Sequence, residues 1–177
     1  MSRRRHRIRP VAVVAVALVV AAACHTPGPG PHVPRAPVRL NEIQVLASHN
    51  SYHVQPEPAL QEALADFLGA AAQGFEYTHH PLAEELDAGV RQIELDVFLD
   101  DPGGGRYAHP RVVELLGVAP PDPALAGPGL KVLHVQEVDF RTTCPTFVAC
   151  LTQVRDWSDA HPRHLPITIQ IEAKDGV

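Results

Sequence analysis

The segment QIELDVF, residues 92–98, decides how this sequence is interpreted, because polar and apolar side chains alternate along it. A period of two places successive side chains on opposite faces of a β-strand. Glu94 and Asp96 therefore share one face with Gln92 and Phe98. The other face holds Ile93, Leu95 and Val97. We expect this apolar face to pack against helices and the two carboxylates to point away from them.

On both sides of this segment, the sequence predicts alternating strands and helices. Three more apolar segments are predicted strands: residues 43–46, 130–135 and 166–171. Helical apolar patterns cover residues 58–72, 81–88 and 146–160, and residues 99–129 are predicted to be largely a Pro/Gly-rich loop. Strands separated by helical or loop segments indicate βα units and a parallel sheet.

The fold class that we expect is α/β, a TIM-type (β/α) barrel of which this chain holds only about the first four βα units. Such a barrel typically needs about 250 residues, and the chain has 177. An open four-stranded sheet is the alternative. We expect a half-barrel to expose unpaired strand edges, and therefore to be poorly stable and inactive by itself.

The first 39 residues are predicted to be a signal peptide and a tether. Five arginines lie in the first nine residues, and an apolar run over residues 11–23 follows, too short to span a membrane comfortably. The run ends in AAAC, similar to a bacterial lipobox, so residues 1–23 are expected to be removed and Cys24 lipidated. Ordinary signal-peptide cleavage nearby is the alternative. Residues 24–39 are rich in proline and glycine and predict a stiff tether, with one domain over residues 40–177.

The charge and the cysteines are consistent with an exported protein, either lipid-anchored to the cell membrane or secreted. Without the first nine residues, 10 of the 15 basic residues remain against 20 acidic ones, which gives no electrostatic footprint for nucleic acid. If Cys24 takes lipid, Cys144 and Cys150 are free to pair in an oxidising compartment. Positions six apart do not face each other on a helix, so we expect a helix that starts at Pro145 and leaves Cys144 outside it. Two unpaired buried thiols are the alternative.

Polar residues collect at the carboxyl end of every predicted strand, which is the edge where sites form in parallel α/β folds. The residues are His49 and Asn50, Glu94 and Asp96, His134, and then Glu172 and Lys174. The oxygen atoms of Asn50, Glu94, Asp96 and Glu172 form a hard ligand set that suits Ca²⁺ or Mg²⁺. An ion-pair network with Arg91 or Lys174 is the alternative.

Two of the eleven histidines are predicted to act on protons, because His49 and His134 end strands at the edge that holds the acids. A pair of histidines across a cation can move a proton on and off oxygen near neutral pH. His53 is an alternative partner that lies further from the strand end.

The segments LASHNSYH (46–53), RQIELDVF (91–98), KVLHV (131–135) and PITIQIEAKD (166–175) resemble, in order, the catalytic half of the calcium-dependent phosphoinositide-specific phospholipases C. The likeness spans residues 40–177 and is closest to the secreted bacterial branch, where the segment 142–162 is also similar. It implies a TIM-type barrel, a bound calcium ion and a phospholipid substrate at a membrane surface. His49 and His134 match the catalytic histidines. The calcium ligands match Asn50, Glu94, Asp96 and Glu172.

The resemblance implies that the inositol 2-hydroxyl attacks the neighbouring phosphorus and displaces diacylglycerol, leaving an inositol phosphate. Calcium would lower the pKa of that hydroxyl, His49 or a carboxylate would help to remove its proton, and His134 would protonate the departing oxygen. Lys174 is expected to contact the substrate. Family members continue through four further strands with headgroup-recognising residues, none of which is in this sequence.

Two rival functions stay open. A glycerophosphodiester phosphodiesterase shares the Glu-x-Asp pair and the later histidine, but those enzymes usually open with His-Arg-Gly, whereas this chain has His49-Asn50-Ser51. A catalytically inactive, surface-anchored binding lipoprotein is the other rival. The presence of both histidines and all four oxygen ligands argues against it.

Overall fold

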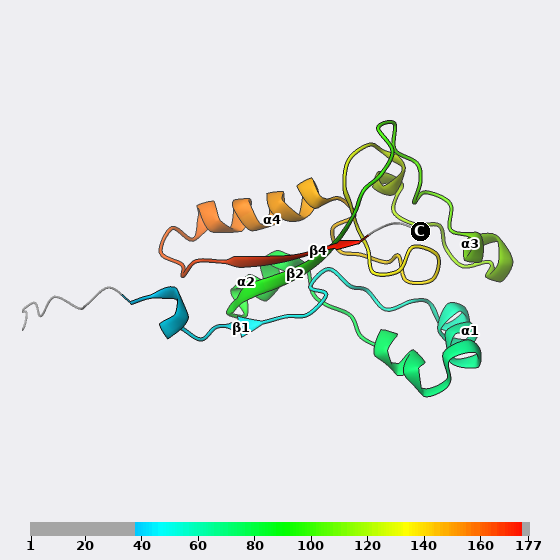
Figure 1. Cartoon of the computed structure of the whole chain (residues 1–177), viewed down its shortest axis with the longest axis horizontal. Helices are drawn as coiled ribbons and strands as arrows, with labels where there is room; N and C mark the ends of the chain where they lie inside the picture. The colour runs from blue at the N-terminus through cyan, green and yellow to red at the C-terminus, as the bar shows by residue number, and fades with distance from the viewer. Residues whose placement is uncertain (1–37, 175–177) are drawn as a thin grey trace, which may run out of the picture. The chain divides into compact units, whose positions relative to one another are not determined.

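The structure is a computed structural model that describes residues 38–174, and these residues form an α/β unit (Figure 1). The strands are β1 (Leu46–Ala47), β2 (Val90–Phe98), β3 (Lys131–Val132) and β4 (Thr168–Lys174). The α-helices are α1 (Pro58–Leu68), α2 (Leu82–Asp87), α3 (Arg111–Leu116) and α4 (Phe147–Ala160). Short 3₁₀ helices cover Leu40–Glu42, Gly69–Phe75 and Pro123–Ala126. The predicted signal peptide, most of the tether and Cys24 lie outside the described residues.

Strand β2 is the centre of the four-stranded sheet. β1 runs parallel to its start, where Leu46 lies opposite Val90, and β4 runs parallel to it over residues 92–98. β3 is antiparallel and pairs only with the carboxyl end of β2, where Lys131 lies opposite Phe98.

The prediction of four parallel βα units is therefore wrong for the third strand. Residues 99–130 form a long connection, containing α3 and a 3₁₀ helix, that brings the chain back to the end of β2 that it left. A strand that starts there can only run back along β2, so it is antiparallel. The α/β class is confirmed, with three parallel strands in the order β1-β2-β4.

One face of the sheet is covered by α2 and α4, as Figure 1 shows for α4 above the strands. Ile93 and Leu95 of β2 are fully buried against Leu86 of α2 and Val154 and Trp157 of α4. Fully burying a side chain of this size contributes about 1.5–3 kcal/mol. This confirms the predicted apolar face of β2, and it directs the two carboxylates of the strand to the other face.

Helix α4 begins later than predicted. Thr146, rather than a residue before Pro145, is the N-cap, and its Oγ1 accepts a hydrogen bond of 3.1 Å from the backbone N–H of Ala149. Cys144 lies before the helix and Cys150 in its first turn, and a disulfide joins them with their Cα atoms 5.1 Å apart. The bridge ties the end of the β3 region to the helix that leads to β4.

The long connection after β2 is held by a buried ion pair. The Nζ atom of Lys131 lies 3.1 Å from Asp100 Oδ2, and both side chains are fully enclosed. Lys131 also donates to the carbonyl of Gly129 at 2.8 Å.

No helix within residues 38–174 combines the length and the hydropathy needed to span a membrane.

Candidate active site

Three carboxylates converge on the sheet face that the helices leave open. Glu94 and Asp96 lie on β2 and Glu172 on β4, and oxygen atoms of the three lie within 4.8 Å of one another. The register explains this, because Asp96 is directly opposite Glu172 and Glu94 is two positions away on the same face. Asp96 is fully buried and Glu94 nearly so. Buried like charges repel and lose hydration, so such a cluster requires a compensating cation.

Lys174 is the ammonium group closest to this cluster in the structure. Its Nζ lies 3.1 Å from Asp96 Oδ2 and 2.7 Å from Glu172 Oε1. Burial raises the pKa of the Asp96 carboxyl in spite of this contact. The hydrogen bond from Lys174 instead holds the pKa of the more exposed Glu172 carboxyl below its usual range. Of the two ion-pair partners considered from the sequence, Lys174 is present, whereas Arg91 donates to the backbone carbonyls of Leu86 and Val90.

Asn50 reaches the same site through an unusual backbone conformation. It follows β1 with φ of +48°, in the left-handed region that asparagine tolerates better than most residues. The turn is held on β2 because the N–H of Ser51 donates to the carbonyl of Glu94 at 3.0 Å. The buried Asn50 amide donates from Nδ2 to the Tyr77 hydroxyl at 3.0 Å, and its Oδ1 accepts from the Tyr52 hydroxyl at 3.4 Å.

These residues fit a calcium ion. Three carboxylates carry three negative charges against one from Lys174, so a divalent cation balances the remainder. The carboxylate and amide oxygens of Asn50, Glu94, Asp96 and Glu172 are hard ligands of the kind that Ca²⁺ takes.

Of the two predicted catalytic histidines, His49 lies at this cluster, and His134 is near enough to act on it electrostatically. His49, in the turn after β1, is largely exposed, and its Nε2 lies 3.7 Å from Glu94 Oε2. His134 follows the antiparallel β3 and is partly exposed. It lies close enough to Glu172 to add to the lowering of that pKa, which comes mainly from Lys174. The cluster therefore has one histidine near Glu94 and another near Glu172.

His53 is not an open alternative to these two, because its side chain is fully buried. Its Nε2 contacts Asp139, a residue that the sequence interpretation missed. The same carboxylate accepts a hydrogen bond of 2.6 Å from His134 Nδ1. The feature of the sequence that could have identified Asp139 is its position five residues after His134. A hydrogen bond of 2.8 Å from the Asp139 N–H to the carbonyl of Val135 closes the intervening loop.

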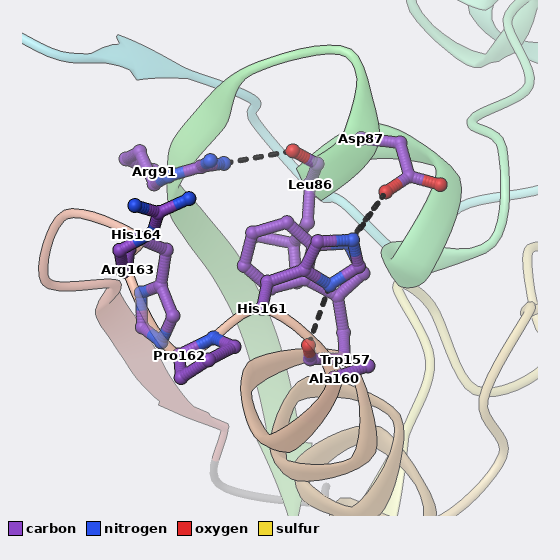
Figure 2. A pocket seen from close by; sticks show the side chains of 9 residues that line it. All are labelled: Leu86, Asp87, Arg91, Trp157, Ala160, His161, Pro162, Arg163 and His164. Atoms are coloured by element: carbon purple, nitrogen blue, oxygen red, sulfur yellow. Dashed lines mark hydrogen bonds and ion pairs between the residues drawn. The ribbon is translucent and has the colours of Figure 1, made fainter.

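The largest cavity among those described, of about 530 Å³, lies elsewhere (Figure 2). It forms where α2 ends, β2 starts and α4 ends, and Arg91, Trp157, His161 and Arg163 line it. Trp157 donates its indole N–H to Asp87 at 2.7 Å, and the Arg91 guanidinium stands 4.7 Å from the centre of the Trp157 ring. Arg91 is five positions before Asp96 on β2, about 16 Å away along a strand. The cavity contains none of the clustered carboxylates.

Comparison with protein families gives one match. The family described as phosphoinositide phospholipase C, Ca²⁺-dependent, matches residues 38–177, which is most of the chain. The match includes the three carboxylates, Asn50 and both histidines of the site. No curated protein and no solved structure matches the chain.

Proposed function

Because the chain belongs to the calcium-dependent phosphoinositide phospholipase C family, we propose that it cleaves phosphatidylinositol-type lipids into diacylglycerol and an inositol phosphate. The observation that carries this proposal is the convergence of Glu94, Asp96 and Glu172 on one sheet face, with His49 3.7 Å from Glu94. The four-stranded sheet is proposed to be part of a TIM-type barrel, since β1, β2 and β4 are parallel and the connections between them contain helices.

We propose that the calcium ion is held by Asn50, Glu94, Asp96 and Glu172. When bound, it supplies positive charge that stabilises the phosphate and favours ionisation of the attacking hydroxyl. The buried Asp96 and the hydrogen-bonded Asn50 are fixed by their surroundings, whereas Glu172 is half-exposed. Ligands that are held in place before binding lower the cost of ordering the site.

The two histidines divide the proton transfers. His49 is proposed to take the proton of the inositol 2-hydroxyl as its oxygen bonds to phosphorus, and a neighbouring carboxylate is the alternative acceptor. The bond from phosphorus to the glycerol oxygen breaks, and His134 gives its proton to that oxygen, which leaves as diacylglycerol. Each transfer of this kind typically contributes 10²–10⁴-fold in rate.

Lys174 is proposed to contact the anionic substrate. In the structure its ammonium is engaged by Asp96 and Glu172, and those two groups hold the pKa of Lys174 above its usual value in spite of partial burial. It is therefore a permanent positive charge at neutral pH, at the edge where the phosphodiester must lie.

Export is proposed from residues 1–24 alone. A signal peptide over residues 1–23 and a lipid on Cys24 would anchor the protein to the cell membrane, and cleavage without lipid would secrete it, as in the secreted bacterial branch of the family. The lipid anchor would hold the site at a phospholipid surface.

The test is product analysis after phosphatidylinositol vesicles are incubated, in calcium and in EDTA, with the protein in a form long enough to close the proposed barrel. Diacylglycerol and an inositol phosphate, formed only in calcium, are expected. Glycerol-3-phosphate would identify a glycerophosphodiesterase, and no product at any calcium concentration would contradict the proposed reaction. His49→Ala should lower the rate at least a hundredfold. His161→Ala, at the separate cavity beside the end of α4, is the matched control and should keep the parent rate.

A further inference from the structure

A buried hydrogen-bonded chain lies behind His134. His53 and Asp139 are both fully enclosed, and the His53 Nε2 lies 2.9 Å and 2.8 Å from the two oxygens of Asp139. The same Asp139 carboxylate lies 2.6 Å from His134 Nδ1. His134 is the member of the chain whose side chain reaches solvent.

The partners fix where the protons are. The Nδ1 atom of His53 lies 2.9 Å from the backbone carbonyl of Tyr77, and a carbonyl oxygen only accepts, so that nitrogen carries a hydrogen. Its Nε2 faces Asp139, so either this nitrogen is also protonated or Asp139 holds the proton. In both cases the buried pair of His53 and Asp139 has no net charge. Titratable groups are tolerated away from water under this condition.

His134 is thereby left with one orientation. Because Asp139 accepts from Nδ1, the other nitrogen of His134, Nε2, points away from the buried pair. The backbone holds the two residues together, since the N–H of His134 donates to the carbonyl of Asp139 at 3.2 Å. The rings of His53 and Phe75 pack against the imidazole, the first nearly perpendicular to it and the second tilted, with ring centres 5.8 Å and 5.5 Å from it.

We propose that Asp139 and His53 are positioning residues that hold His134 as the Nδ1–H form, with Nε2 directed at the leaving oxygen. Asp139 fixes the imidazole, and His53 anchors Asp139 and balances its charge. The kinetic part of this proposal rests on the proposed function, in which His134 donates the proton from Nε2. The tautomer is a property of the protein itself.

The stacking of Tyr77 on His53 extends the chain to the other half of the site. The two rings are 4.1 Å apart and nearly parallel, and the Tyr77 hydroxyl accepts the hydrogen bond from Asn50. Tyr77 therefore links Asn50, a proposed calcium ligand, to the buried pair that contacts the proposed acid.

A metal ion held by His53, Asp139 and His134 is the competing interpretation, because one atom from each lies within 4.8 Å of the others. The separations within the chain are those of hydrogen bonds, 2.6–2.9 Å between nitrogen and oxygen. Two ligand atoms that each lie about 2.0–2.2 Å from a tetrahedral Zn²⁺ ion are roughly 3.3–3.6 Å apart, and the ion removes the protons between them. The observed spacing leaves no room for it.

The first measurement is the ring ¹⁵N spectrum of the histidines, assigned to His134 by comparison with His134→Gln. At a pH where His134 is neutral, the proton is expected on Nδ1 in the parent protein. In Asp139→Ala it should move wholly or partly to Nε2. A parent His134 protonated at Nε2 would overturn the proposal, and this result does not depend on whether the protein cleaves any lipid. If Asp139→Ala does not fold, the parent spectrum still decides.

The second measurement is kinetic. Asp139→Ala, or Asp139→Asn if the first variant is unfolded, should lower kcat on phosphatidylinositol about 10- to 100-fold with little change in KM. On an inositol phosphodiester with a nitrophenol leaving group, which needs no acid, the loss should be much smaller. Asp66→Ala, an exposed carboxylate on α1, is the control and should match the parent on both substrates. Equal losses on the two substrates would show a merely structural role, and zinc binding that requires all three residues would replace the proposal. An inactive parent would reject the proposed function and leave the tautomer result standing.

Discussion

Replacing Asp96 by asparagine should stabilise the calcium-free protein and remove its stabilisation by calcium. Carboxylate oxygens of Glu94 and Glu172 lie within 4.8 Å of Asp96. At that distance and an effective dielectric constant of about 20, each pair repels by about 3.5 kcal/mol, with the Glu172 share reduced by its exposure. Lys174, at 3.1 Å, attracts Asp96 by about 5 kcal/mol on the same scale. Attraction and repulsion nearly cancel, so the cost of burying the charge remains, in agreement with the raised pKa of Asp96.

Asparagine keeps the shape and removes the charge. We therefore expect about 1–2 kcal/mol of added stability without calcium, which is an increase in Tm of about 3–6 °C for a domain of this size. The assay is thermal unfolding followed by circular dichroism, in EDTA and in calcium. The parent should gain about 2.7 kcal/mol when calcium is about 100 times its Kd, and Asp96→Asn should gain almost none. Asp66→Asn should behave as the parent in both conditions. If Asp96→Asn were less stable than the parent in EDTA, Asp96 would not be a destabilising buried charge. If the variant were stabilised by calcium as much as the parent, Asp96 would not be a calcium ligand.

Three further predictions concern the acid, the disulfide and a buried ion pair. His134→Ala should lower turnover of phosphatidylinositol at least a hundredfold, and a nitrophenol leaving group should restore much of the rate; equal losses in the two rate assays would exclude the acid role. Reducing the bond between Cys144 and Cys150 should lower the free energy of unfolding by about 2 kcal/mol, as expected for a short loop, and denaturant titrations with and without dithiothreitol would measure it. Although burial opposes it, Lys131 holds the pKa of Asp100 below its usual value, so this pair should stabilise the fold above about pH 4 and the stability should be lost as the pH falls further. Denaturant titrations across this range should show a smaller loss in Lys131→Met than in the parent.

The faces of β2 and β4 could be predicted because strict alternation fixes which side chains point together. Glu94 and Asp96 had to share a face, and Glu172 joins them once β4 pairs with β2 in the observed register. The direction of a short strand is different. The apolar residues of β3 can pair with a parallel or an antiparallel neighbour equally well. The long connection that turns the chain back contains α3, a short helix in a segment rich in proline and glycine.

The residues proposed to contact calcium and substrate could be named from the sequence, whereas the residues behind them could not. His49 and Asn50 follow a strand directly, and their chemistry is visible in the sequence. The pairing of His53 with Asp139 joins residues 86 positions apart, and neither lies on a regular strand. Only the folded chain shows that a histidine considered for the site is instead a buried partner of an aspartate.

Calcium-dependent cleavage is tested most directly by the phosphorus-31 spectrum of phosphatidylinositol vesicles incubated with the protein in a form long enough to close the proposed barrel, first in EDTA and then after calcium is added. We expect no change in EDTA. With calcium, the signal of a water-soluble inositol phosphate should replace the lipid phosphodiester signal. Asp96→Asn should leave the lipid signal intact. Cleavage that proceeds equally in EDTA, or a product that is glycerol phosphate, would contradict the assignment of this carboxylate cluster as the calcium site of a phosphoinositide phospholipase C.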